Sequence, residues 1–332
     1  MEKRFNFRIY PNKAQEEQIR KNFGCVRFVY NYFLSKRMEK YNAGKGIYTY
    51  YEASKDLTVL KKTEGYAWLK EADSHSLQNA LKDMNFAFSQ FYRRTREKNA
   101  QPGFPRFKKK GETRQSYMSQ AQIGRNGVPS IAVLEKTIKL PKLGFVACRV
   151  SKPISGRILS ANVFQVPSGK YFVSVCCTDI EQEAFPQTGK EITLHVGTQS
   201  LTVSSEMTQK KISRLHRHLS RKPRGSANYE KARVTLAKAH ERVKNQKTDM
   251  LQKLSTQLVR DHDLICIRKA ELEKMREKSH FTYHLWDTSW GEFVKMLKYK
   301  CNWYGKTLVE VPGTQDTDSD ILSKPLWNPG NF

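Results

Sequence analysis

Residues 191–205 read EITLHVGTQSLTVSS, and the alternation within this stretch sets the expected fold. Apolar residues alternate with polar ones on both sides of a turn at 196–199, which is the period of two of half-buried strands. The sequence therefore predicts two short strands joined by a tight turn. Strand pairs of this kind often present catalytic carboxylates to a metal-bound phosphate. Here the residue at the pivot is His195, and the stretch contains no aspartate.

A long basic segment follows this strand pair. Residues 208–247 hold thirteen Lys and Arg against two Glu, and Pro223-Arg224-Gly225 divides their helical pattern in two. The pattern then predicts a strand at 264–267, a helix at 288–304 and a strand at 307–311. This order is typical of a ribonuclease-H-like layered domain over 190–311, with a basic helical segment at 208–260. The turn-rich residues 312–332 predict a flexible tail.

The first half of the chain predicts a barrel and a helical lobe. Residues 3–10 alternate between an apolar face and a basic or polar face, as a strand does. Helical spacing covers 14–38, 50–61 and 74–98, with a break or bend expected at Gly24. Strand patterns over 123–178 include a hairpin turn at 167–170. We therefore expect a β-barrel from 1–13 and 122–182, a helical lobe inserted at 14–121, and a linker at 181–189.

The net charge of +27 on 332 residues indicates a polyanionic partner, and nucleic acid is the expected one. A basic membrane-surface protein and a ribosomal-type protein are the alternatives. The six scattered cysteines include no C-x-x-C pair, so no structural zinc is expected, and they suit a reducing cytosol. The sequence predicts no secretory signal and no membrane span.

Aromatic and cationic residues are interleaved in RRTREKNAQPGFPRFKKKGETR, residues 93–114. This stretch has nine Lys and Arg against two Glu. The combination favours neutralisation of a phosphate backbone together with base stacking. The simpler interpretation is a solvated charged surface.

Several segments, given in chain order, carry a resemblance to a known family: FRIYPNKAQEEQI, FGCVRFVYNYFL, WLKEADSHSLQNALKDM, PGFPRFKKK, IKLPKLG, SGKYFVSVCCT, LAKAHERVKNQKTDMLQKLSTQLV and SWGEFVKMLKYKCNWYGKTLVEV. They resemble the TnpB family of transposon-encoded RNA-guided nucleases, relatives of the type V CRISPR effectors. The resemblance implies an α+β multidomain protein with a wedge-type β-barrel, an inserted helical recognition lobe and a RuvC-like domain. It also implies a guide RNA that pairs with double-stranded target DNA, while the protein reads a short flanking motif.

Two positions depart from the family's catalytic pattern. His195 stands where the first aspartate is expected, and Arg268 stands where the glutamate is expected. Histidine is a poor Mg²⁺ ligand and arginine cannot be one. A guanidinium about 4 Å from Mg²⁺ would repel it by roughly 8 kcal/mol at an effective dielectric near 20. The expected catalytic set is therefore empty, with no Mg²⁺, no zinc and no enzyme activity.

The family's later motifs also lack counterparts. No cysteine follows Cys301, so the four-cysteine zinc module expected after Val311 is not found in residues 312–332. Three aspartates of the tail could replace the third catalytic carboxylate, or they belong to an acidic solvated tail: Asp316, Asp318 and Asp320.

These departures resemble the nuclease-dead, TnpB-like repressors. The expected function is RNA-guided, nuclease-inactive binding of DNA in the bacterial cytoplasm, associated with the nucleoid, which represses transcription by occupying a promoter. One alternative is a transposon-derived RNA-binding remnant without DNA targeting. The other is a residual RNA-guided DNA endonuclease that uses displaced carboxylates.

The resemblance also supplies candidate binding residues. An amide such as Gln78 can pair bidentately with adenine, although each candidate could be an ordinary surface residue. The candidates for reading the flanking DNA motif are Tyr50, Ser54, Ser74, His75, Gln78 and Gln122. The candidates for contacts to the nucleic-acid backbone are Lys3, Arg4, Arg8, Arg27, Arg106, Lys108, Lys139, Lys142, Arg214, Arg217, Arg221, Arg242 and Lys244.

Overall fold

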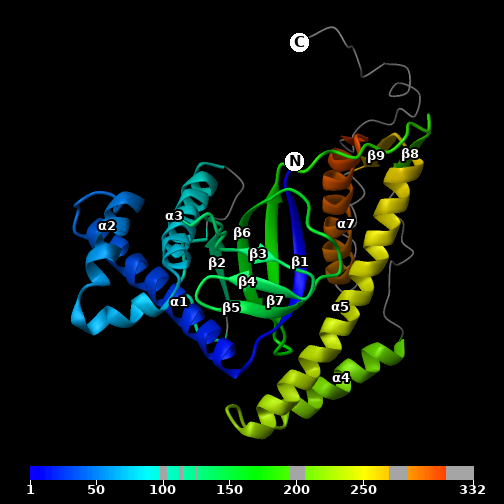
Figure 1. Ribbon diagram of the computed structural model, residues 1–332. Coiled ribbons are helices and arrows are strands. Elements are labelled where there is room, and N and C mark those ends of the chain that lie inside the picture. Colours follow the sequence, from blue (N-terminus) through cyan, green and yellow to red (C-terminus); the bar gives the residue numbers. More distant parts are fainter. Residues whose placement is uncertain (98–102, 112–114, 125, 195–205, 269–282, 312–332) are drawn as a thin grey trace. The chain divides into compact units, whose positions relative to one another are not determined.

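The structure is a computed structural model that describes residues 1–97, 103–111, 115–124, 126–194, 206–268 and 283–311 (Figure 1). The chain divides into two compact units, Met1–Glu181 and Gln182–Phe332. Each unit has its own buried core. In the part of the chain that the structure describes, no helix has both the length and the apolar character needed to cross a membrane.

The first unit contains a seven-stranded antiparallel sheet in the order β2-β6-β7-β1-β5-β4-β3 (Figure 1). The strands are β1 (Lys3–Tyr10), β2 (Ser116–Gln120), β3 (Ala132–Val133), β4 (Thr137–Leu140), β5 (Gly144–Arg149), β6 (Arg157–Gln165) and β7 (Tyr171–Thr178). The first strand lies in the middle, because β1 pairs with β7 on one side and with β5 on the other. Among the described strands, β2 and β3 form the two edges of the sheet and do not pair with each other. Closure of the sheet into a wedge barrel therefore stays a prediction.

The alternation of buried and exposed side chains shows which face of β1 packs against the core. Phe7 and Ile9 are buried, whereas Arg4 and Tyr10 are exposed. The predicted hairpin between β6 and β7 is confirmed, since the backbone N–H of Val166 donates to the Lys170 carbonyl at 3.0 Å. Gly169 adopts a φ of 87°, the left-handed conformation that such a turn needs.

Three helices and one 3₁₀ helix complete the first unit, and the first and third helices make the main contacts with the sheet. They are α1 (Lys13–Asn42), α2 (Tyr50–Leu60), η1 (Glu64–Glu71) and α3 (Ser74–Arg96). The three predicted helices are confirmed, and a capping box between Asn12 and Gln15 fixes the start of α1. The break or bend expected at Gly24 is wrong in so far as α1 continues through this residue as one helix.

The prediction that residues 14–121 form only a helical lobe does not account for β2. Residues 116–120 pair with β6 and so belong to the sheet. The sequence signal for this strand is weak, because a serine, Ser119, takes one of its two buried positions beside Tyr117. The hydroxyl of Ser119 donates to the Asp73 carboxylate at 2.7 Å, which satisfies the buried polar group.

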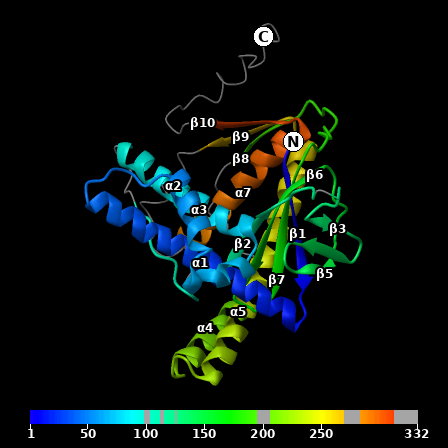
Figure 2. The same cartoon turned by 60° about the vertical axis from the view of Figure 1, so that its left-hand side comes forward.

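The second unit contains a parallel three-stranded sheet in the order β10-β9-β8 (Figure 2). Its elements are β8 (Glu191–Leu194), α4 (Glu206–Ser220), α5 (Ala227–Asp261), β9 (Leu264–Arg268), α7 (Tyr283–Tyr304) and β10 (Thr307–Val311). The core joins α5, α7 and β9 through buried side chains such as Leu251, Leu297 and Ile265. The order of strand, long helix, strand, helix and strand agrees with the sequence-based expectation. The second predicted strand, around 201–203, lies outside the described residues.

Candidate nucleic-acid interface

The candidate cations of the sheet lie on different sides of it. Arg4 is exposed, and the Arg8 guanidinium stacks 4.8 Å above the Tyr10 ring centroid. Lys3 precedes Phe5 and Phe7 by an even number of residues. It therefore lies on the same face of β1 as these two residues, and Arg4 lies on the opposite face. The sequence brings these cations onto one strand, and the pleat divides them between two faces.

Two more cations lie on the neighbouring hairpin. Lys139 is half-buried on β4, and Lys142 is exposed in the turn before β5. Lys142 has a φ of 64°, which a tight turn imposes. The side-chain amide of Gln15 donates to the carbonyls of Leu143 and Phe145, at 3.2 Å and 2.9 Å, and so anchors this turn to the start of α1.

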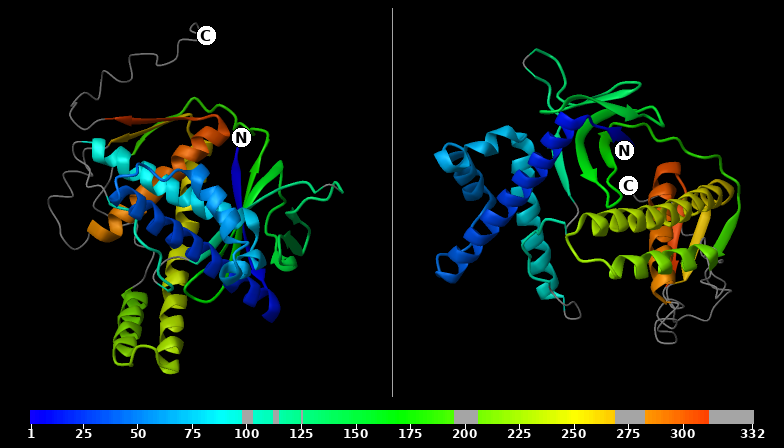
Figure 3. Two further views of the ribbon diagram at one scale, coloured as in Figure 1. Left: turned by 90° about the vertical axis from the view of Figure 1, so that its left-hand side faces the viewer. Right: turned by 90° about the horizontal axis from the view of Figure 1, so that it is seen from below.

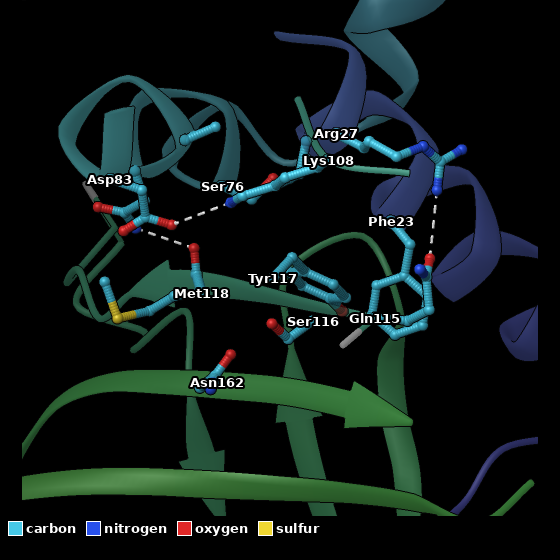
Figure 4. A pocket seen from close by; sticks show the side chains of 13 residues that line it. Phe23, Arg27, Ser76, Asp83, Lys108, Gln115, Ser116, Tyr117, Met118 and Asn162 are labelled. Atoms are coloured by element: carbon cyan, nitrogen blue, oxygen red, sulfur yellow. Dashed lines mark hydrogen bonds and ion pairs between the residues drawn. The ribbon is translucent and has the colours of Figure 1, made fainter. Parts of the chain in front are cut away.

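Arg27 and Lys108 line one cavity of about 170 Å³ between α1, α3 and β2 (Figure 4). The Arg27 guanidinium donates to the Gln115 side-chain oxygen at 3.3 Å. Amide and hydroxyl groups from α3 and the sheet complete the lining, including Asn79, Ser116 and Asn162. Figure 4 shows that Arg27 and Lys108 approach the cavity from above the strands in that view.

Neighbouring side chains engage both the backbone and the ammonium group of Lys108. Its backbone exchanges two hydrogen bonds with the Asn31 side chain, at 2.8 Å and 2.9 Å. Its ammonium lies 4.0 Å from the Tyr30 ring centroid and 3.8 Å from the Asp83 carboxylate. Burial lowers the pKa of Lys108, against the opposing effect of Asp83. This cation is therefore already engaged within the unit, whereas Arg106 on the same segment is exposed.

Five of the flanking-motif candidates lie on two helices. Tyr50 and Ser54 are one turn apart on α2, and Ser74 and Gln78 are one turn apart on α3, so each pair shares a helix face. The two helices pack against each other. His75 follows Ser74, and its Nδ1 is buried with no hydrogen-bond partner in the described structure.

Gln122 lies apart from the helices, in the exposed segment after β2. Its backbone N–H donates to the Ser130 hydroxyl at 2.9 Å, and its carbonyl accepts from the Ser130 N–H at 2.8 Å. These two bonds hold the position of its backbone and leave its exposed side chain at the surface.

The residues that position α3 are absent from the predicted set. The Asp73 carboxylate caps α3 by accepting from the Ser76 N–H at 3.0 Å, and it also accepts from Ser119 of β2. The Asn79 amide donates to the Met118 carbonyl of β2 at 2.8 Å. Together these bonds fix the face that carries Ser74 and Gln78 relative to the sheet. The sequence signal was the Asp-x-x-Ser pattern of a helix start, which identifies a cap but not its second partner.

The basic helical segment forms a hairpin of α4 and α5, which lie side by side (Figure 3). His216 and His240 meet across it, with their Nε2 atoms 3.2 Å apart. The Glu230 carboxylate lies 2.8 Å from the Arg233 guanidinium, so this cation of the hairpin already has an ion-pair partner. The five predicted cations of the hairpin are all exposed: Arg214, Arg217, Arg221, Arg242 and Lys244.

Arg268, where the resemblance implies a catalytic glutamate, lies at the carboxyl end of a parallel strand, and His195 follows Leu194 in the sequence. Leu194 is the last residue of β8 and pairs with Ile267 of β9. Arg268, the next residue of β9, pairs with Val311 of β10. His195 lies outside the described residues.

The described residues show no group of three or more His, Cys, Asp or Glu side chains that could hold a metal ion. A catalytic divalent metal therefore has no matching ligand set in that part of the chain.

Comparison with known proteins adds several similarities. A family described as "Helix-turn-helix domain" matches residues 1–46, and a family described as "Probable transposase" matches residues 193–279. A Streptomyces pristinaespiralis protein named "Putative RNA-guided DNA endonuclease" is 32% identical over 322 residues, or 92% of this chain and 76% of that protein. The Escherichia coli K12 protein "Putative RNA-guided DNA endonuclease InsQ" is 29% identical over 334 residues, or 93% and 80%.

A solved structure extends the similarity to the fold. The chain is similar to the "Cryo-EM structure of the Cas12f1-sgRNA-target DNA complex", with a TM-score of 0.50 and 11% identity over 94% of this chain and 89% of that one. Residues 1–46, matched to helix-turn-helix domains, here contain β1 and one long helix, α1.

The expectation that the chain is not an enzyme is wrong. Both relatives are named RNA-guided DNA endonucleases, and this chain covers more than three quarters of the length of each. The residue types at His195 and Arg268 are therefore not sufficient to establish that a catalytic site has been lost.

Proposed function

Since this chain belongs to the TnpB family, we propose that it binds a guide RNA and uses it to bind double-stranded DNA beside a short flanking motif. Where that DNA lies in a promoter, the bound complex represses transcription by occupying the site. Such a protein would act in the bacterial cytoplasm, at the nucleoid.

The exposed cations of the α4–α5 hairpin carry this proposal. Helix α5 has 35 residues, and at about 1.5 Å per residue it is roughly 50 Å long. That length matches about 15 base-pair steps of a duplex at about 3.4 Å each. Cations spread over such a length neutralise many phosphates at once, which is the main source of affinity for nucleic acid. The solved complex similar in fold contains a guide RNA and target DNA, which supports the same two partners here.

The first unit is proposed to read the flanking motif. Helix α3 presents Ser74 and Gln78 on one face, and the bonds of Asp73 and Asn79 to β2 hold this face in place. Held amide and hydroxyl groups of this kind discriminate base edges in the major groove. Tyr50 and Ser54 on α2, His75 on α3 and Gln122 after β2 are the remaining candidates for this role.

Sequencing of the RNA that copurifies with the protein tests the guide. We expect one defined RNA with a short variable 3′ segment. Duplex DNA complementary to that segment should then be bound and protected from a footprinting reagent, and a scrambled duplex should not. Recovery of bulk cellular RNA, or equal binding of both duplexes, would contradict the proposal.

RNA-guided cleavage of the same DNA is a second candidate function, and the names of the two relatives favour it. The matched duplex, incubated with the complex and Mg²⁺, separates the two candidates. Strand breaks at the matched site would assign an endonuclease. Intact strands, together with loss of expression from a reporter whose promoter carries the matched site, would assign repression by occupancy.

A further inference from the structure

A second cavity, of about 230 Å³, lies along the α1–α3 pair. It begins about three turns further along α1, and between one and two turns further along α3, than the residues that line the first. These two helices lie side by side (Figure 2). Its lining is mainly aromatic, in contrast to the amides and hydroxyls of the first cavity. The side chains that matter here are Arg37, Tyr41, Phe88, Phe91, Tyr92 and Phe104.

One aromatic ring of this cavity meets two of the others at steep angles. Phe104 is edge-on to Phe88 and Phe91, with centroids 5.6 Å and 5.3 Å apart and interplanar angles of 89° and 77°. Phe104 is 46% exposed and Tyr41 is 68% exposed. Large aromatic side chains gathered at a surface are a feature of binding sites rather than of cores.

Arg37 is a buried cation at this cavity. It is 6% exposed, and its guanidinium lies 3.9 Å from the Phe88 ring centroid. One guanidinium nitrogen donates to the Asn85 side-chain oxygen at 3.2 Å. Among the described residues no carboxylate forms an ion pair with Arg37. A buried guanidinium without a carboxylate is costly in free energy unless a ligand supplies an acceptor or an anionic group.

The surroundings of the cavity are positive. Arg93, Arg94 and Arg96 are exposed in the last two turns of α3, directly after the ring-bearing residues. Glu97 is 3.9 Å from Arg93 and offsets one of these charges. A polyanion is therefore attracted to the part of the helix where the aromatic cavity lies.

We propose that this cavity holds one unstacked nucleobase of the guide RNA, a role that rests on the proposed function. The rings supply a stacking surface that accepts any base, and Arg37 donates hydrogen bonds to the base edge or to its phosphate. A cavity of about 150 Å³ is large enough for benzene, so this one has room for a larger ring system. Single-stranded RNA presents such splayed-out bases to aromatic and guanidinium groups.

Ultraviolet cross-linking of the copurified RNA–protein complex, followed by mass spectrometry, tests the proposal. We expect cross-linked nucleotides on peptides that contain Tyr41, Phe91 or Tyr92. Tyr41→Ala and Tyr92→Ala should lose the cross-link and weaken binding of the same RNA by about 5- to 150-fold. Phe86→Ala is the matched control, since Phe86 is an exposed aromatic of α3 that does not line the cavity.

The experiment distinguishes failure of the proposed base site from failure of the proposed RNA-guided function. If a defined RNA copurifies but no cross-link maps to these peptides, the base site is refuted and RNA guidance stands. The base site is likewise refuted if Tyr41→Ala and Tyr92→Ala bind RNA as tightly as Phe86→Ala, with unchanged thermal unfolding. Cross-links at the cavity to the DNA strand in place of RNA would also overturn it. Absence of any defined RNA refutes the function.

Discussion

The Lys306 ammonium contacts the Asp263 carboxylate, and this pair joins the starts of all three parallel strands of the second unit. Asp263 immediately precedes β9 and Lys306 immediately precedes β10. The same carboxylate accepts from the backbone N–H groups of Thr188 and Gly189, which precede β8, at 2.8 Å and 2.6 Å. The pair thus sets the register in which the strands run to their carboxyl ends, where Leu194 and Arg268 lie.

Asp263→Asn should destabilise the second unit. The Lys306 side chain is fully buried, and without its carboxylate it would be a poorly compensated charge, at a cost of about 3 kcal/mol. Chemical denaturation should show this loss as a lower midpoint. Asp249→Asn is the control, because Asp249 forms an exposed pair with Lys253 one turn away on α5, and its loss should cost less than about 0.5 kcal/mol. Equal effects of the two substitutions would contradict the assigned role.

The stability of the second unit should fall in acid. Burial alone would raise the pKa of Asp263, but hydrogen bonds from Lys306, Gly189 and Thr188 outweigh it and lower the pKa to about 2. A carboxyl whose pKa is lower in the folded state stabilises fully above its unfolded pKa of about 3.9, and this stabilisation is lost as pH falls towards 2. Denaturation at pH 5, 4 and 3 should show it, and the decline should be smaller in Asp263→Asn. Parallel curves would rule out this carboxyl as the source.

Exposed cations of α5 should contribute to the salt dependence of nucleic-acid binding. Arg242→Gln and Lys244→Gln, each in an exposed position, should each lower the slope of log affinity against log salt by about 0.7 for single strands or about 0.9 for a duplex. Binding titrations at several salt concentrations measure this slope. Arg233→Gln, which removes a cation already paired with Glu230, should change it less.

Lys108 and Arg106 should differ in what their loss affects. Lys108→Met removes the contacts to Tyr30 and Asp83 and should lower the free energy of unfolding by about 1 kcal/mol, with a small effect on RNA affinity. Arg106→Gln, at an exposed position, should leave stability within about 0.5 kcal/mol and weaken RNA binding. Thermal unfolding and RNA titration of both variants check this. The opposite pattern would show that Lys108 is the phosphate contact.

Gln78→Ala should relax selection of the flanking motif. Loss of a bidentate amide–adenine pair costs about 1–3 kcal/mol of discrimination, or roughly 5- to 150-fold between the best and the next base. Binding of the guide-matched duplex to all four bases at each flanking position measures the ratio. Gln90→Ala, three turns further along α3, is the matched control. An unchanged base preference in Gln78→Ala would assign the selection to another candidate.

The helices and most strands follow from local periodicity, but the contacts that connect them do not. The alternation of residues 3–10 predicts β1, whereas its partners β5 and β7 lie more than 130 residues away. The strand β2 is hard to predict from the sequence, because the serine at the buried position 119 interrupts the apolar alternation. The hydroxyl of Ser119 is satisfied there only by its hydrogen bond to Asp73, which precedes α3.

For the candidate sites too, the sequence predicts the residue types but not the contacts that these residues make. Basic composition predicts nucleic-acid binding, and the five predicted cations of the α4–α5 hairpin are exposed as a binding surface requires. The same composition cannot distinguish Lys108, which neighbours engage, from the exposed Arg106 two residues away. Arg37 appears in the sequence as one more polar residue of a helix, and only the packing of Phe88 and Asn85 around it shows that it is a buried cation.

The central place of β1 has a consequence for protein synthesis. Residues 3–10 leave the ribosome first, yet the β7 residues that pair with them begin at Tyr171. At about 5–20 residues per second, the ribosome needs roughly 8–32 s to make the intervening chain. During that time the edge of β1 that pairs with β7 has no partner, although β5 is made earlier for the other edge. A nascent chain stalled before Tyr171 should therefore attract chaperones and proteases that ignore the finished protein.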